Sequence, residues 1–183
     1  MNFPILSSLI LLPIIGSVFI FFNKSSEKNR SIKYVSIFIS FSNFLLALYL
    51  WYIFDKTISD FQFIEDREWI SGLINYKVGI DGISILFVVL TAFITPLCVI
   101  SVISTIKYRL KDFLIAILIM ESLMIGVFCS LDLVVFYLFF EGGLIPMFLI
   151  IGIWGGERRV YSAFKFFLYT LLGSVLMLVA IIS

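Results

Sequence analysis

The chain has 183 residues, of which 62% are hydrophobic and only 14% are charged, and its mean hydropathy is +1.16. Soluble domains carry about 25% charged residues, so this composition excludes a soluble globular protein and predicts a polytopic membrane protein. The formal net charge of +1 argues against a nucleic-acid partner.

Six stretches predict membrane-spanning helices, because a helix needs about 20 apolar residues to cross a bilayer. They lie at roughly 3–22, 33–54, 80–105, 112–130, 132–154 and 161–182. The expected fold is therefore an all-α polytopic membrane protein, with residues 1–183 in a single transmembrane domain. The first stretch lacks a basic region before it and a small-residue cleavage site after it, which favours a retained helix over a signal peptide. The sixth stretch runs to the end of the sequence, which suggests a fragment.

The polar segment 55–79, between the second and third stretches, predicts either a short hairpin or an interfacial segment. Asp81 lies just before the third stretch and Asp132 lies in the tight turn before the fifth. Aspartate at these positions is typical of a helix N-terminus, where its carboxylate accepts hydrogen bonds from free backbone amides.

Lysine and arginine in the loops predict the orientation, because short cytoplasmic loops are enriched in them. Three alternate loops are basic and carry Lys24, Lys28, Arg30, Lys33, Lys107, Arg109, Lys111, Arg158 and Arg159. The N-terminal tail and the turn near residue 131 have no basic residue, and acids offset the cations of 55–79. We therefore expect the N-terminus and the loop 55–79 outside, the basic loops inside, and the C-terminus outside.

The cysteine and histidine content limits which cofactors the chain could bind. There is no histidine, and the two cysteines, Cys98 and Cys129, lie in different apolar stretches. Bis-histidine haem is excluded, and two separate cysteines cannot provide the ligands of an iron–sulfur cluster. The nucleotide motifs GxGxxG and GxxxxGK[ST] are absent. We expect no redox cofactor or metal in this chain, and a proton relay made of carboxylates, lysine, tyrosine and water.

Glu141 lies near the middle of the apolar stretch 132–154. A charge at that depth costs several kcal/mol unless it is paired, hydrated or protonated, so we predict a role in an ion or proton path. The alternative is a purely structural hydrogen bond to a neighbouring helix. Gly142 and Gly143 would permit close helix approach or local unwinding, and Pro146 leaves the carbonyl of Gly142 without its helical donor.

Two more ionisable residues lie inside neighbouring apolar stretches. The helical neighbours of Glu121 on its own face are apolar, so its partner must come from another helix. Lys165 lies about one turn into its stretch and shares a face with Ser162 and Tyr169. A lysine there can also extend to the membrane surface without any transport role. Counted from the predicted inner ends, Glu141 is deepest, Glu121 is next and Lys165 is shallowest, which suggests an inner half-channel.

An ordered set of segments resembles a known family. The segments are MESLMIGVF (120–128), LDL (131–133), FYLFFE (136–141), LIPM (144–147), IGIWG (151–155) and KFFLYTLLGS (165–174), preceded by VGIDGIS (78–84). They resemble subunit M of proton-pumping NADH:quinone oxidoreductase, respiratory complex I, which is called NADH dehydrogenase subunit 4 in mitochondria. The resemblance covers essentially 60–183 and weakens toward the N-terminus. Mrp-type cation/proton antiporter chains share part of the set.

The resemblance implies an antiporter-like, proton-translocating subunit of an oxidoreductase, with no redox chemistry of its own. It implies that NADH, FMN, iron–sulfur clusters and quinone bind elsewhere in the complex. Other membrane subunits would be its partners, in the bacterial inner membrane or the mitochondrial inner membrane. It also implies that Glu141, Glu121 and Lys165 form a proton path.

The family pairs its fifth-helix glutamate with a lysine on a broken seventh helix, and this chain does not contain that lysine. The resemblance therefore implies the N-terminal portion of a longer or split protein. Two alternatives stay open. One is a component of an Mrp-like monovalent cation/proton antiporter, and the other is a structural assembly piece without its own proton path.

Overall fold

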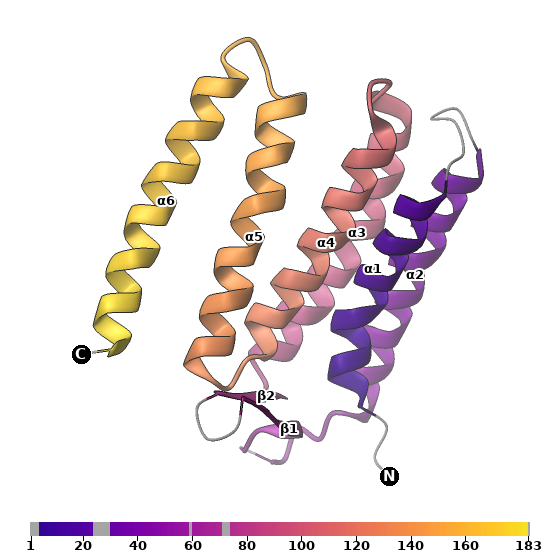
Figure 1. Cartoon of the computed structure of the whole chain (residues 1–183). Helices are drawn as coiled ribbons and strands as arrows, with labels where there is room; N and C mark the ends of the chain where they lie inside the picture. Colours follow the sequence, from indigo (N-terminus) through magenta and orange to yellow (C-terminus); the bar gives the residue numbers. More distant parts are fainter. Residues whose placement is uncertain (1–3, 24–29, 59, 71–73, 183) are drawn as a thin grey trace.

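The computed structural model describes residues 4–23, 30–58, 60–70 and 74–182. Within these residues it contains the elements α1 (Ile5–Phe22), α2 (Arg30–Ile53), β1 (Gln62–Ile70), β2 (Ile74–Ile80), α3 (Ser84–Thr105), α4 (Leu110–Cys129), α5 (Leu133–Trp154) and α6 (Arg159–Ile182) (Figure 1). The six helices are each long and apolar enough to cross a membrane. The predicted all-α polytopic fold is therefore confirmed. Residue 3 of the first predicted stretch, and residues 59 and 71–73 of the predicted loop, lie outside the described residues.

The segment between α2 and α3 contains a hairpin, one of the two alternatives for 55–79. Strands β1 and β2 pair antiparallel, with Asp66 opposite Lys77 in the register and their side chains 3.7 Å apart. Since Ile80 belongs to β2, helix α3 begins at Ser84 and not at the predicted residue 80. Asp81 Oδ1 accepts a hydrogen bond of 2.7 Å from the Ser84 amide, which caps α3 as expected and lowers the pKa of the Asp81 carboxyl.

Helix α4 lies at the centre of the arrangement. It packs against α1, α3 and α5 and also contacts α2, whereas the main helical contact of α6 is α5 (Figure 1). More than half of the span of α4 is buried, compared with 6% of the span of α6. Helix α4 therefore holds α1, α3 and α5 directly, whereas α2 packs mainly on α3 and α1, and α6 packs on α5.

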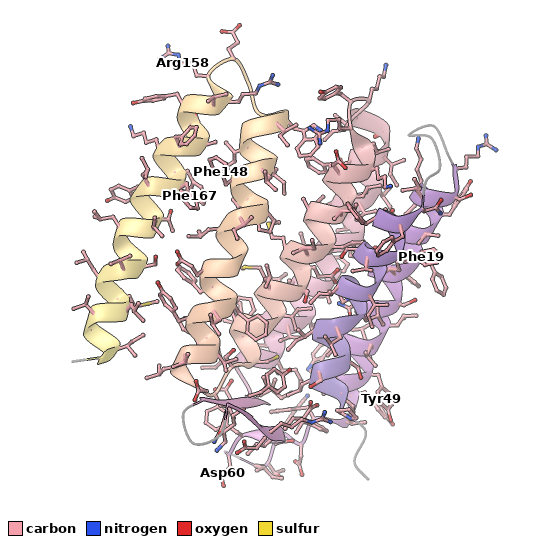
Figure 2. All side chains as sticks on the ribbon, in the orientation of Figure 1. Phe19, Tyr49, Asp60, Phe148, Arg158 and Phe167 are labelled. Carbon is pink, nitrogen blue, oxygen red and sulfur yellow. The ribbon has the colours of Figure 1, made fainter. Side chains whose placement is uncertain are left out.

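The N-terminus, the hairpin and the α4–α5 turn lie at one end of the helices (Figure 1). The α3–α4 and α5–α6 connections, which carry Lys107, Arg109 and Arg158, lie at the opposite end, whereas Lys24 and Lys28 lie outside the described residues. Asp60, beside the hairpin, and Arg158, between α5 and α6, mark these two ends in Figure 2. These two described basic connections and the hairpin are therefore at opposite ends of the helices, and the orientation in the membrane stays a prediction.

Polar side chains hold the helix ends together. Asp132 Oδ1 accepts hydrogen bonds from the amides of Val134 and Val135, at 2.8 and 3.1 Å, so it caps α5 as expected. At the basic end, Lys111 Nζ donates to the carbonyls of Phe21 and Asn23, at 2.9 and 2.8 Å. A cation at these carbonyls complements the C-terminal dipole of α1.

Glu65 of β1 ties the hairpin to α1. Its carboxylate accepts hydrogen bonds from the amides of Leu6 (2.9 Å) and Ser7 (3.2 Å) and from the Ser7 hydroxyl. Tyr76 of β2 lies beside them, with its hydroxyl 3.2 Å from Ser7 Oγ. Because α1 has no side-chain cap from its own N-cap residue, Glu65 supplies the acceptor for its first turn.

Replacing Gly126 by alanine should loosen the α4–α5 interface. An added Cβ would lie 2.6 Å from Cδ1 of Phe139, and such overpacking costs about 1–3 kcal/mol. Gly143→Ala is the matched control, because nothing lies within 4 Å of its Cβ position. It should leave the free energy of unfolding in detergent unchanged or raise it. Equal stability of the two variants would show that this contact does not hold α4 against α5.

Removing the Glu65 carboxylate should destabilise the first turn of α1. Glu65→Ala leaves the amides of Leu6 and Ser7 without their acceptor, and loss of an N-terminal cap costs about 0.5–2 kcal/mol. Asp66→Ala is the control, since its ion pair with Lys77 is half exposed and worth at most about 1 kcal/mol. Denaturant titration in detergent compares the two, and a larger loss in Asp66→Ala would contradict the capping role.

Candidate functional site

A stripe of small and polar residues, with a larger apolar residue at each end, forms the buried face of α2. Its members recur every three or four positions: Ile32, Ser36, Ser40, Asn43, Ala47 and Leu50. Small residues let helices approach closely in a membrane, where apolar burial does not drive helix association. The hydroxyls of Ser36 and Ser40 donate to carbonyls of their own helix, at 2.5 and 3.1 Å. This stripe brings Asn43 against the centre of the helix assembly.

Asn43 is the partner of Glu121. Its Nδ2 donates to Glu121 Oε1 at 2.9 Å, and the two residues are 0% and 2% exposed. The expectation that Glu121 is bonded from another helix therefore holds, and α2 is that helix. Asn43 itself was not among the predicted site residues. One sequence signal could have found it, because no other asparagine lies within the six predicted spans.

The hydrogen bonds of this pair are incomplete. Among the described residues, Asn43 Oδ1 and Glu121 Oε2 are buried acceptors without a donor. The adjacent Ser122 does not supply one, because its hydroxyl donates to the carbonyl of Ile10 on α1 at 2.5 Å. Unsatisfied buried oxygens are costly, since they lose water and gain no bond in return.

Glu141 lies on α5, which runs as one helix through Gly142, Gly143 and Pro146. Of the two roles suggested for the glycines, close approach applies to Gly142, because a Cβ there would lie 3.3 Å from Cδ2 of Leu123 on α4. Local unwinding does not occur. Glu141 is half-buried, and its Oε2 is a third buried acceptor without a partner among the described residues.

Lys165 is exposed on α6, as are Ser162 and Tyr169 of the same predicted polar face. Its Nζ lies 6.0 Å from the ring centroid of Tyr161. The other side of α6 meets α5 through aromatic contacts, where Phe148 and Phe167 lie together with ring centroids 5.3 Å apart (Figure 2). Within the described part of the chain, no ion pair joins Lys165 to Glu121 or Glu141. The structure thus places the two acids on neighbouring packed helices and the lysine on a separate outer surface.

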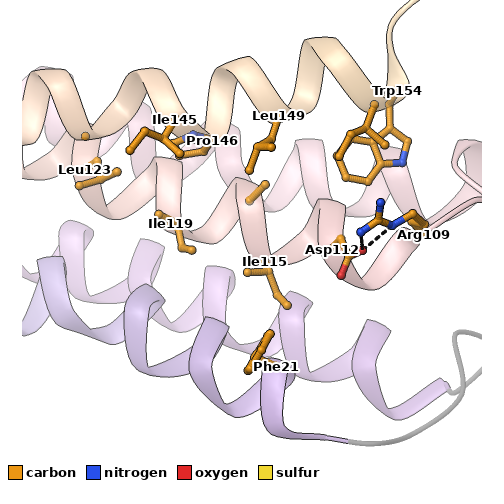
Figure 3. Close-up of a pocket in the computed structure, with 13 residues that line it drawn as sticks. Phe21, Arg109, Asp112, Ile115, Ile119, Leu123, Ile145, Pro146, Leu149 and Trp154 are labelled. Carbon is orange, nitrogen blue, oxygen red and sulfur yellow. Dashed lines mark hydrogen bonds and ion pairs between the residues drawn. The ribbon is translucent and has the colours of Figure 1, made fainter.

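A cavity of about 510 Å³ lies along α1, α4 and α5 (Figure 3). The Arg109–Asp112 ion pair, at 2.6 Å, lies at one end, and the remaining wall is mostly isoleucine, leucine and aromatic carbon. None of the three predicted proton-path residues lines it. An apolar wall gives water no hydrogen-bond partners, so this cavity is not the inner half-channel suggested by the graded depths. Among the described residues, no three histidine, cysteine, aspartate or glutamate side chains gather to hold a metal ion.

Comparison with known proteins connects this geometry to a family. Residues 130–183 match the family described as "NADH:quinone oxidoreductase/Mrp antiporter, TM". The chain also resembles a solved structure titled as the membrane-bound sulfane sulfur reductase, an archaeal respiratory membrane complex. That likeness has a TM-score of 0.76 at 20% identity and covers 94% of this chain and 26% of the other, so it supports the fold alone.

Curated relatives are more similar in sequence. NADH-quinone oxidoreductase subunit M of Rhodobacter capsulatus is 58% identical over 85% of this chain and 30% of its own length. NADH-ubiquinone oxidoreductase chain 4 of Marchantia polymorpha is 48% identical over 97% of this chain and 36% of its own. Subunit M of Rickettsia prowazekii is 44% identical over 100% of this chain and 38% of its own. The chain therefore spans about a third of the length of these relatives, and over that length it is similar in sequence to NADH-quinone oxidoreductase subunit M and to chain 4 of NADH-ubiquinone oxidoreductase.

Proposed function

We propose that this chain is part of a membrane-arm subunit of NADH:quinone oxidoreductase and takes part in proton translocation coupled to electron transfer from NADH to quinone. The observation that carries the proposal is the pair of acids, Glu121 and Glu141, on two packed membrane-spanning helices of a subunit M homologue. Acids at such depth are costly and mark ion paths or proton relays in membrane proteins.

Each of the three ionisable residues has a part in this proposal. Glu141 gains and loses the proton, and Glu121, on the adjacent α4, couples to it laterally. Lys165 lies on the outer face of α6, so the carboxylate or water that it meets belongs to another segment or subunit. The chain binds no cofactor in this scheme, and NADH, FMN, iron–sulfur clusters and quinone belong to other subunits. Antiporter-like membrane subunits and the lipid bilayer are its neighbours.

One other function has specific support. The matched family includes Mrp antiporters as well as the oxidoreductase, so exchange of monovalent cations for protons is the second candidate. Mild-detergent purification of the membrane complex that contains this chain separates the two. Recovery with a flavin and iron–sulfur assembly supports the respiratory function. Recovery with antiporter chains and no redox centre, together with sodium transport, would replace it.

Glu141→Gln should keep assembly and abolish coupled proton transfer. The amide has the shape of a protonated carboxyl, but it cannot release a proton at working pH. The measurement is the proton-to-electron ratio of the reconstituted complex, with the assembled fraction checked on a native gel. Glu157→Gln is the control, because Glu157 is an exposed carboxylate in the turn before α6. A normal ratio in Glu141→Gln would refute the role of Glu141. Full assembly with unchanged transport in both Glu141→Gln and Glu121→Gln would favour a structural role for the chain.

The orientation can be tested by labelling single cysteines from one side of the membrane. In a background lacking Cys98, Asp60→Cys should react with an impermeant maleimide applied outside, because it lies beside the hairpin. Glu157→Cys should react only after permeabilisation, because it lies at the end with the basic loops. The reverse pattern would place the N-terminus inside.

A further inference from the structure

In the buried pair, each residue has one oxygen that lacks a hydrogen-bond donor. Asn43 uses its Nδ2 and leaves its Oδ1 without a donor, while Glu121 uses its Oε1 and leaves its Oε2 without one. Each unpartnered oxygen shares a carbon with an atom of the hydrogen bond, so pairing the whole amide with the whole carboxyl group would take only one more hydrogen bond. Two acceptor oxygens can form such a bond only if one of them carries a proton, and a carboxyl oxygen is able to carry one.

Among the residues that the structure describes, no cation forms an ion pair with Glu121. The sequences of α1 and α3 contain no lysine, arginine, aspartate or glutamate, and the buried stripe of α2 contains none either. On α5, the ionisable groups near its depth are Glu141 and Tyr137, and neither is cationic. From β2, Tyr76 bonds Ser7 and Lys77 pairs with Asp66. An ionised Glu121 would therefore be a buried charge without a counter-ion, which apolar surroundings strongly disfavour.

We propose that Asn43 and Glu121 form a proton-holding site, in which Glu121 is a carboxylic acid whose Oε2–H donates to Asn43 Oδ1. The amide Nδ2 donates to Oε1 in return. One added proton then satisfies both unpartnered oxygens and removes the buried charge. Asn43 is the positioning residue of this site, and it fixes the carboxyl of Glu121 between α2 and α4. The pairing rests on the hydrogen bond of 2.9 Å and on the two unpartnered oxygens, whereas its use in translocation rests on the proposed function.

Infrared spectroscopy of the membrane complex containing the full chain tests this pair. The difference between wild type and Glu121→Gln should contain one carboxylic-acid C=O band that the variant has lost. In Asn43→Leu the same band should move to higher frequency, because the acid no longer donates to an amide oxygen. Ser17→Ala is the control, since Ser17 is buried on α1 and bonds only the carbonyl of Ile14 among the described residues. It should leave the band in place.

Two results would overturn the proposal. Loss of carboxylate bands in place of the acid band would mean that Glu121 is ionised. A water band that shifts in ¹⁸O-labelled water and disappears in Glu121→Gln would mean that a water molecule, and not the acid proton, joins the two oxygens. If Asn43→Leu fails to assemble, Asn43→Ala takes its place, and the Glu121→Gln spectrum still decides the protonation state. The acid band is measured without turnover. It can therefore be present or absent whatever the proton-to-electron ratio of Glu141→Gln turns out to be.

Discussion

The hydrogen bond between Asn43 and Glu121 is the buried polar contact that ties α2 to the central helix α4. It joins α2 to α4 through two fully buried side chains, so both must find their hydrogen-bond partners inside the helix assembly. The small residues of the α2 stripe make this contact possible, because they let α2 approach the central helices closely. The same pair of residues therefore joins two helices and forms the proposed proton-holding site.

The two acids lie on helices that pack against each other, the central helix α4 and its neighbour α5. Glu121 lies on α4 itself, and Glu141 lies on α5, which is held close to α4 where Gly126 meets Phe139 and Gly142 meets Leu123. At both ends, polar contacts from the connecting segments hold the helix termini in place. The result is a compact block of α1 to α4, with α5 attached through close glycine contacts and α6 attached mainly to α5.

The outer helix α6 differs from this block in a way that bears on function. Its span is almost entirely uncovered, and Lys165 lies on its exposed face. A lysine ammonium facing hydrocarbon is unfavourable, so this face needs protein, water or the membrane surface beside its charge. The similar curated subunits are about three times as long as this chain.

The sequence by itself determined the membrane class, the helical fold, the caps formed by Asp81 and Asp132, and the ionisable residues inside the spans. These features depend on local composition and on the cost of placing a charge in hydrocarbon, and both can be read from a single stretch. Only the tertiary structure decided that Asn43 is the partner of Glu121, that strands β1 and β2 pair, and that Lys165 lies exposed on the outer helix α6. Those facts depend on how helices far apart in the sequence rotate and pack against each other. Apolar composition leaves this rotation undetermined, because a helix that is hydrophobic on every side has no face that the sequence alone directs inward.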